Sequence, residues 1–155
     1  MLQAKVNLTS ASTRQFIMET GSGHHLIVDD AVGKTGPKPV ELVVGALAGC
    51  TAFDVITILR SKKHKHITAY EVSVEADQLQ SPPQVFTDIR IHHRITGDDI
   101  DAGSVEDAIE LSEEKYCSVE AMLRQSGAQI KTTYSIFDNA GNLIGSSRRA
   151  EPVAA

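Results

Sequence analysis

Two cysteines are the residues of this sequence best suited to chemistry of their own. Cys50 lies in the segment Gly45–Thr51, and its neighbours at helical spacing are apolar or neutral apart from Asp54. None of these neighbours is a cation, and burial in apolar surroundings raises the pKa of a thiol and makes it inert. From its neighbours alone, Cys50 is more simply explained as a small core residue. A reactive Cys50 requires a cation from elsewhere in the fold.

Cys117 has a more acidic setting within the segment Ser112–Val119. If this segment is helical, Glu113, Glu114 and Glu120 are its neighbours, and Cys117 falls beside the apolar stripe rather than on it. Carboxylates disfavour a thiolate, so Cys117 is a poor first nucleophile and better suited to resolving an oxidised partner. The alternative is a boundary cysteine without a function.

The histidines do not form a recognisable metal site. They occur as the pairs His24–His25, His64 with His66, and His92–His93. Adjacent residues on a strand point to opposite faces, and residues two apart do not share a helix face. The sequence has neither a CxxC nor an HExxH motif, and no glycine-rich phosphate loop. We therefore expect no metal and no bound cofactor.

Composition limits the classes of partner. The chain has 155 residues, of which 41% are hydrophobic and 23% charged, and its net charge of −5 argues against nucleic acid or an anionic membrane. The N-terminal residues lack a signal-peptide pattern, and we expect no apolar stretch of the roughly 20 residues that span a membrane. These features predict a cytoplasmic protein whose cysteines are free thiols or a transient catalytic pair.

A central helix from Pro39 to about Ser61 must position Cys50. Its apolar residues cover the helical circle almost completely, which is typical of a helix buried on all sides. Gly45 and Gly49 each cost about 1 kcal/mol relative to alanine, so we expect another backbone to approach closely there.

Strands and a second helix surround this segment in the sequence. A helix is expected over Val105–Gln125, capped by Ser104 and ended by Gly127. The predicted order is β-β-β-α-β-β-α-β, an α+β fold with one domain over residues 1–145 and a flexible tail over 146–155. The expected strands are Gln3–Thr9, Gln15–Thr20, His24–Val28, Tyr70–Ala76, Val85–Thr96, Gln129–Phe137 and a short pairing at Leu143–Ile144.

Two segments resemble the osmotically inducible protein C and organic hydroperoxide resistance family. Gly36–Cys50 is similar to the loop, proline, glutamate, helix and cysteine of that family, and Ser112–Val119 is similar to its second-cysteine helix. The resemblance implies the family's α+β fold, with a buried central helix in an intertwined homodimer and the cysteines at the subunit interface. A partner chain would then cover the second apolar side of the helix.

The resemblance also implies a chemistry. Cys50 would attack an organic hydroperoxide as part of oxidative stress defence, and Cys117 would condense with the resulting sulfenic acid to form a disulfide. An external dithiol or lipoyl-type reductant would then restore both thiols. Arg14, the single arginine before Arg60, would activate the Cys50 thiolate, and Glu41 would orient that arginine.

The sequence resembles the OsmC-like branch more closely than the hydroperoxide-resistance branch. Glu41 follows Val40, whereas peroxidase members carry their glutamate directly after the proline, and one residue turns a helical side chain by about 100°. Leu47 and Phe53 are candidate pocket walls, although core packing would explain either residue. A non-enzymatic dimer that binds an apolar small molecule or senses redox state, and a purely structural dimer, are the alternatives.

Overall fold

The computed structural model describes residues 1–147 and divides into two compact units, Met1–Val43 and a second unit that begins at Val44. Both units contain a sheet, and the second also contains most of the helical residues, which confirms the predicted α+β class. Most of the predicted tail lies outside the described residues. Ser146, its first residue, belongs to the last strand instead, where it pairs with Ser135.

The first unit is a three-stranded antiparallel sheet in the order β1-β2-β3. The strands are β1 (Ala4–Leu8), β2 (Phe16–Thr20) and β3 (His25–Val28), close to the predicted bounds. The hairpin between β2 and β3 turns at Gly23, whose φ of 82° suits glycine, and the Gly23 N–H donates to the Thr20 carbonyl over 2.9 Å.

The central helix begins at Pro39 as predicted and is continuous as α1 (Pro39–Thr57) with a π-helical turn, η1 (Ile58–Lys62). Within the described chain α1 buries one stripe, Leu47, Thr51 and Val55, which recur every fourth residue. Phe53 is 77% exposed on another side. The expectation of burial on all sides is therefore wrong for the single chain, because the described residues cover only one side of the helix.

Two further expectations for this helix are corrected. A Cβ added at Gly45 or Gly49 would meet no atom within 4 Å, so no other described backbone approaches these glycines. Pro39–Lys62 is also 24 residues long and contains an 18-residue window with a mean hydropathy of 2.1, so by length and composition it could span a membrane, contrary to expectation. The core helix of a protein can have the same composition. The open space beside the two glycines and the apolar composition together describe a helix with an uncovered apolar side.

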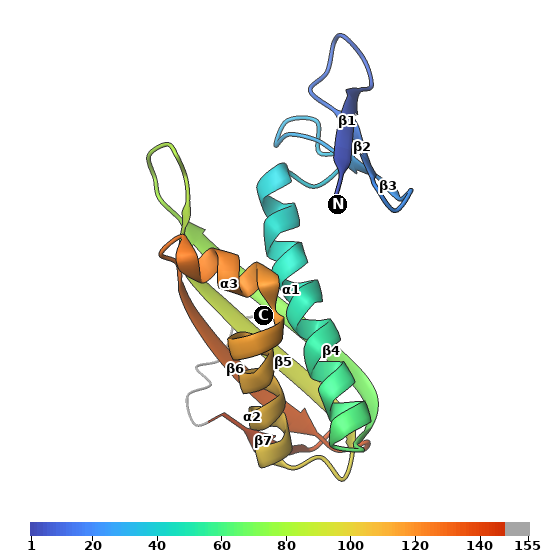
Figure 1. Cartoon of the computed structure of the whole chain (residues 1–155), viewed down its shortest axis with the longest axis vertical. Helices are drawn as coiled ribbons and strands as arrows, with labels where there is room; N and C mark the ends of the chain where they lie inside the picture. The colour runs from blue at the N-terminus through green and yellow to red at the C-terminus, as the bar shows by residue number, and fades with distance from the viewer. Residues whose placement is uncertain (148–155) are drawn as a thin grey trace. The chain divides into compact units, whose positions relative to one another are not determined.

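The second unit is built on a four-stranded sheet in the order β4-β5-β6-β7, with β5 and β6 parallel and the other pairs antiparallel. Figure 1 shows α2 and α3 on the same side of this sheet as α1. The strands are β4 (His66–Gln78), β5 (Phe86–Asp98), β6 (Gln129–Phe137) and β7 (Leu143–Ser146). The bounds of β6 match the prediction, whereas β4 is longer at both ends.

The predicted helix over Val105–Gln125 is in fact three elements: α2 (Ala102–Leu111), the π-helical turn η2 (Ser112–Tyr116) and α3 (Ser118–Gln125). The N-cap of α2 is Asp101 rather than Ser104, because the Asp101 carboxylate accepts a hydrogen bond of 2.8 Å from the Ser104 N–H. Gly127, with a φ of 94°, follows α3 as expected.

The core of the second unit lies between the sheet and the helices in two clusters. One contains Val55 and Leu59 of the central helix with Ile95 and Ile136 of the sheet. The other contains Leu47 with Ile89, Ile91 and Cys117, and Cys50 packs against it. The second cluster therefore holds both cysteines at the place where α1 meets the break between η2 and α3.

Candidate functional site

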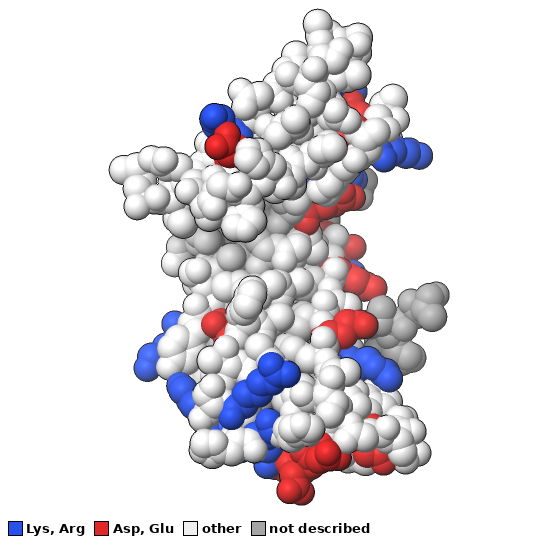
Figure 2. Space-filling view, turned by 90° about the vertical axis from the view of Figure 1, so that its right-hand side faces the viewer, with Lys and Arg blue, Asp and Glu red and all other residues white. Residues whose placement is uncertain are grey.

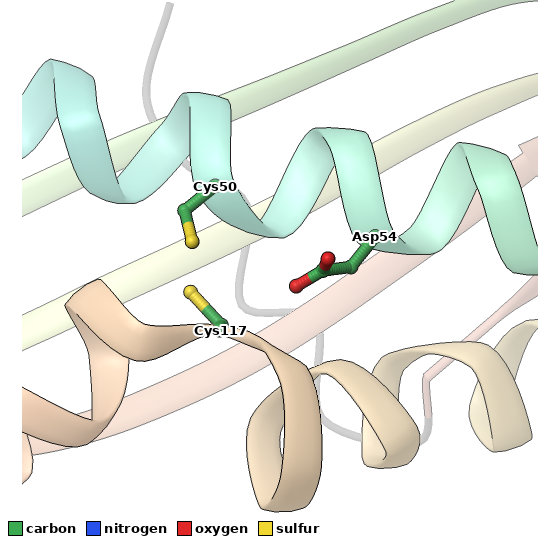
Figure 3. A group of neighbouring side chains, drawn as sticks. All are labelled: Cys50, Asp54 and Cys117. Carbon is green, nitrogen blue, oxygen red and sulfur yellow. The ribbon is translucent and has the colours of Figure 1, made fainter.

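Cys50 and Cys117 face one another as free thiols from two different helical segments. Figure 3 shows the Cys50 sulfur on α1 pointing toward the Cys117 sulfur, with the Asp54 carboxylate beside both. The two sulfur atoms and one Asp54 oxygen lie within 4.8 Å of one another. Cys117 is 2% exposed, whereas Cys50 is partly exposed. The structure thus brings the two predicted cysteines together within one chain.

The break in the helix explains how Cys117 becomes buried. Cys117 has an extended backbone, with φ of −74° and ψ of 92°, and its N–H donates to the Ser112 carbonyl over 2.8 Å at the end of η2. Wide π turns of this kind are frequent at functional sites. The expectation that Cys117 lies off the core stripe assumed a regular helix through residue 117, and it is wrong because this break turns the side chain inward.

Asp54 is the site residue for which the sequence interpretation assigned no role. It lies one turn after Cys50 on α1, and its Oδ2 accepts a hydrogen bond of 3.1 Å from Ser112 Oγ. Ser112, which is fully buried, is also within hydrogen-bond distance of Thr51 Oγ1, at 3.3 Å. These bonds connect α1 to η2 directly beside the thiols. The available signal was a carboxylate four residues after a cysteine, in a stretch from Leu42 to Leu59 that has no other charged residue.

Burial controls the protonation of Cys117. It raises the pKa of this thiol to about 12, and the adjacent Cys50 and the charge of Glu120 act in the same direction, while a hydrogen bond from the Glu120 backbone opposes them. The sequence also indicated that the Glu120 carboxylate disfavours a thiolate at Cys117, and the direction of this pKa shift agrees with it. Cys117 is therefore a protonated thiol at neutral pH, which fits a resolving thiol better than a first nucleophile.

A second buried polar pair lies between the two core clusters. His93 is fully buried on β5 between Ile91 and Ile95, and its Nδ1 shares a hydrogen bond of 2.6 Å with Tyr70 Oη. Burial lowers the pKa of His93 to about 4, helped by the neighbouring His92. Burial raises the pKa of Tyr70, and the negative charge of Asp54 adds to this. The sequence did not indicate this pair, because its pairing across two strands depends on the register.

Arg14 and Glu41 belong to the first unit, and both cysteines belong to the second. The Arg14 guanidinium forms an ion pair of 2.6 Å with Asp30 and lines a cavity of about 560 Å³. Glu41 accepts a hydrogen bond of 2.8 Å from the Lys38 N–H, which holds the pKa of Glu41 below its usual value. Along α1, Glu41 and Cys50 are separated by about two and a half turns.

The two candidate pocket residues differ in position. Leu47 is fully buried and packs in the cluster that contains Cys117, so its role in the described chain is core packing. Phe53 lines a pocket of about 320 Å³ in the second unit together with Asp54, Lys62 and Tyr116. The pocket thus has an apolar wall, and the carboxylate beside the thiols forms part of its lining.

Comparisons with known proteins agree with this fold. The sequence model of the OsmC-like protein family matches residues 32–133, which include both cysteines. The chain belongs to this family. Protein YhfA of Escherichia coli strain K12 is 37% identical to this OsmC-like protein over 125 residues, which cover 81% of the chain and 91% of YhfA.

Solved structures share the fold of this OsmC-like protein. A hypothetical protein from Aquifex aeolicus VF5 superposes with a TM-score of 0.78 at 25% identity, covering 90% of this chain and 98% of that one. A Legionella pneumophila structure named as an organic hydroperoxide resistance protein gives a TM-score of 0.63 at 16% identity, over 86% and 96% of the two chains. At that identity the likeness shows the fold alone.

Proposed function

We propose that this protein is a thiol-dependent peroxidase that reduces organic hydroperoxides. The observation that carries the proposal is the pair of free thiols, Cys50 and Cys117, whose sulfur atoms lie within 4.8 Å of each other. Cys50 is the more accessible of the two, and Cys117 is held protonated. Family membership supports the same chemistry, since a hydroperoxide resistance protein has this fold.

The reaction begins at Cys50. Its thiolate attacks the terminal oxygen of the hydroperoxide, the O–O bond breaks, and the alcohol leaves with a proton while Cys50 becomes a sulfenic acid. Cys117 sulfur then attacks the Cys50 sulfur, an S–S bond forms and water leaves with the Cys117 proton. An external dithiol or lipoyl-type reductant returns the pair to thiols by exchange. We assign this cycle to the cytoplasm, where thiols are kept reduced.

The groups next to Cys50 in the second unit, Cys117 and Asp54, carry no positive charge. A cation must therefore reach the thiolate from another part of the assembly, and Arg14, oriented by Glu41, remains the candidate that the family resemblance gives. An opposite charge lowers a pKa by one to three units, so Arg14→Gln should slow peroxide consumption near neutral pH by about tenfold or more.

A homodimer is part of this proposal. The uncovered side of α1 includes the exposed Val43, Ala46 and Phe53, and Figure 2 shows a broad area without charged side chains on one face of the molecule. Contiguous exposed apolar surface of this kind marks an interaction site. Sedimentation velocity should give a dimer for the wild type and a monomer for Ala46→Glu; a monomeric wild type at micromolar concentration would contradict the dimer.

Enzyme kinetics test the peroxidase directly. Cumene hydroperoxide loss is followed with an excess of a dithiol for wild type, Cys50→Ser, Cys117→Ser and the control Thr57→Ser, which changes an exposed residue of the same helix. We expect turnover in wild type and Thr57→Ser, none in Cys50→Ser, and at most a slowed cycle in Cys117→Ser. Equal rates in wild type and Cys50→Ser would contradict the proposal.

A non-enzymatic binding or redox-sensing dimer is the second candidate, and the pocket of about 320 Å³ favours it because Phe53 and Ile58 give it an apolar wall. In that case an apolar ligand would bind without consumption of hydroperoxide. Binding of a fluorescent apolar probe that Phe53→Ala weakens, together with unchanged peroxide, would favour this function over the peroxidase.

A further inference from the structure

Three potential metal ligands converge at one place in the second unit. The Cys50 sulfur, the Cys117 sulfur and an Asp54 oxygen lie within 4.8 Å of one another, and none of the three residues is fully exposed. Figure 3 shows the three side chains pointing toward a common point between α1 and the end of η2. In a tetrahedral zinc site the metal–ligand bonds are about 2.0–2.3 Å, so the ligand atoms lie roughly 3.3–3.8 Å apart. The upper limit of 4.8 Å on the distances between the three atoms includes this range, and closure onto a metal requires side-chain shifts of about 1 Å at most.

We propose that Cys50, Asp54 and Cys117 bind one Zn²⁺ ion per chain when both cysteines are reduced. Two thiolates and a carboxylate form the borderline-soft donor set that zinc prefers, whereas magnesium and calcium prefer oxygen ligands alone. The proposal revises the expectation of no metal site. That expectation relied on sequence spacing, and residues 50 and 117 are too far apart in sequence to form a spacing motif.

The surroundings of Asp54 suit a metal ligand. Ser112 Oγ donates to Asp54 Oδ2, and no described residue donates a hydrogen bond to Oδ1, which is available to bind a metal. Outer hydrogen bonds of this kind fix the orientation of a ligating carboxylate. Ser112 is itself fully buried and also bonded to Thr51, so the carboxylate is held on a packed part of the fold rather than on a mobile surface.

The carboxylate side of the site borders a pocket. Asp54 lines the pocket of about 320 Å³ that Phe53 and Tyr116 also line, and in the proposed site a water from this pocket supplies the fourth ligand. Three protein ligands and one water complete a tetrahedral zinc site. On binding, each cysteine that is still a thiol releases its proton to solvent, and no electrons are transferred because zinc has no redox chemistry.

Zinc and the disulfide exclude each other, because both use the same two sulfur atoms. The zinc-bound thiolates are shielded from hydroperoxides and alkylating reagents, and removal of the metal returns a reduced pair. If the proposed peroxidase function holds, zinc is therefore a reversible inhibitor that stores the protein in its reduced form. Binding itself does not depend on that function, since it requires only the three ligands.

The test uses the full-length, metal-free, reduced protein and two metals. Zinc affinity is measured by competition with a chromophoric chelator, and Co²⁺ is added as a spectroscopic probe. We expect one equivalent of zinc with a micromolar or tighter dissociation constant, and a cobalt spectrum with thiolate charge-transfer absorption and tetrahedral d–d bands. Thiol alkylation should be slowed at least about tenfold by zinc, a result that does not depend on enzyme activity.

Variants locate the site. Cys50→Ser and Cys117→Ser should each weaken zinc binding on the order of 100-fold or more, and Asp54→Asn, which can still accept the Ser112 hydrogen bond, about tenfold to 100-fold. His64→Gln with His66→Gln is the control for adventitious surface binding and should leave the affinity unchanged. Wild-type protein oxidised to the disulfide should not bind zinc, which provides a comparison that does not rely on any variant folding.

Two results would overturn the proposal. One is the absence of a thiolate–cobalt band and of micromolar zinc binding in reduced protein; the other is zinc affinity that survives Cys50→Ser or oxidation. Metal-free protein is assayed with cumene hydroperoxide in parallel. Peroxide turnover without zinc binding would reject the metal site alone, whereas zinc binding without turnover would reject the peroxidase alone.

Discussion

The two units of this chain differ sharply in how many of their side chains are buried. Within residues 1–43 the buried positions are Val28 and Asp29, each 5% exposed, and all five residues of β1 are exposed. The second unit has two core clusters, fully buried polar residues and both thiols. Since apolar burial is the main source of folding free energy, the second unit has a core of its own and the first does not.

The two units also carry different parts of the proposed active site: the thiols lie in the second unit, and the residues proposed to activate them lie in the first. The second unit holds the sulfur atoms and Asp54 within 4.8 Å of one another, so this part of the site requires only one chain. The first unit holds Arg14 between β1 and β2, Glu41 in the first turn of α1, and a sheet with half-exposed apolar side chains such as Val6 and Leu8. A sheet of this kind is stabilised by packing against another surface, and a second subunit is the cover that we propose.

The largest expected effect comes from removing core volume in the second unit. Leu59 is fully buried, so Leu59→Ala should lower the free energy of unfolding by about 2–5 kcal/mol, whereas Ile27→Ala, at a 43% exposed position of the first sheet, should cost less than about 1 kcal/mol. Urea unfolding of dilute protein measures both. At concentrations where sedimentation velocity gives a monomer, an equal cost would break the comparison, because it would mean that the first sheet is buried without a partner subunit.

The next effect is the pH dependence that His93 gives to the second unit. Its folded pKa of about 4 is below the usual value of 6.5, so between these pH values the unfolded chain binds a proton that the folded chain does not. The free energy of unfolding should therefore fall by about 3 kcal/mol from this group as the pH is lowered from 6.5 to 4.

Urea unfolding across this pH range checks the assignment to His93. The variant His93→Gln should lose this part of the pH dependence, while the matched control His24→Gln, at an exposed position of the first unit, should keep it. An unchanged pH dependence in His93→Gln would contradict the buried, neutral histidine.

Much of the fold could be predicted from the sequence, and the reasons differ from element to element. The bounds of β6 and the start of α1 followed from local signals, namely β-branched alternation and a proline in the first helical turn. The N-cap of α2 was misassigned because Asp101 and Ser104 are both good caps, and which of them caps depends on the path of the preceding chain.

The candidate site could be predicted only in part, because local sequence patterns do not specify tertiary packing. Cys50 and Cys117 could be found from their sequence surroundings, but the inward turn of Cys117 results from the π turn and the extended residue, which no helical periodicity encodes. Asp54 becomes a site residue only because Ser112 and Cys117 pack against it. Tertiary packing therefore decides the part of the site that local patterns do not specify.

A smaller effect tests the hydrogen bonds beside the thiols. Ser112→Ala removes the donor to Asp54 and the hydroxyl that pairs with Thr51 within the second unit, and it should cost about 1–3 kcal/mol in the free energy of unfolding. Thr35→Val in the first unit should cost less, because Asp29 keeps hydrogen bonds from the N–H groups of Asp30 and Thr35. Urea unfolding ranks the two variants; the reverse order would contradict the comparison.

The smallest effect is expected at the surface of the first unit. Lys5 and Glu19 form an ion pair of 2.9 Å between β1 and β2, and both side chains are exposed. Exposed pairs contribute little because water and salt screen them. Lys5→Ala should therefore leave the urea midpoint unchanged within error at physiological salt. A clear loss would show that this pair is shielded from water in the assembled protein.

The most direct test of the central claim, that Cys50 and Cys117 act as one redox pair, is peptide mapping without reduction after a single equivalent of cumene hydroperoxide. The account predicts a Cys50–Cys117 disulfide in wild type and, in Cys117→Ser, a Cys50 sulfenic acid that a dimedone probe labels. Two intact thiols in wild-type protein after exposure to the hydroperoxide would contradict it.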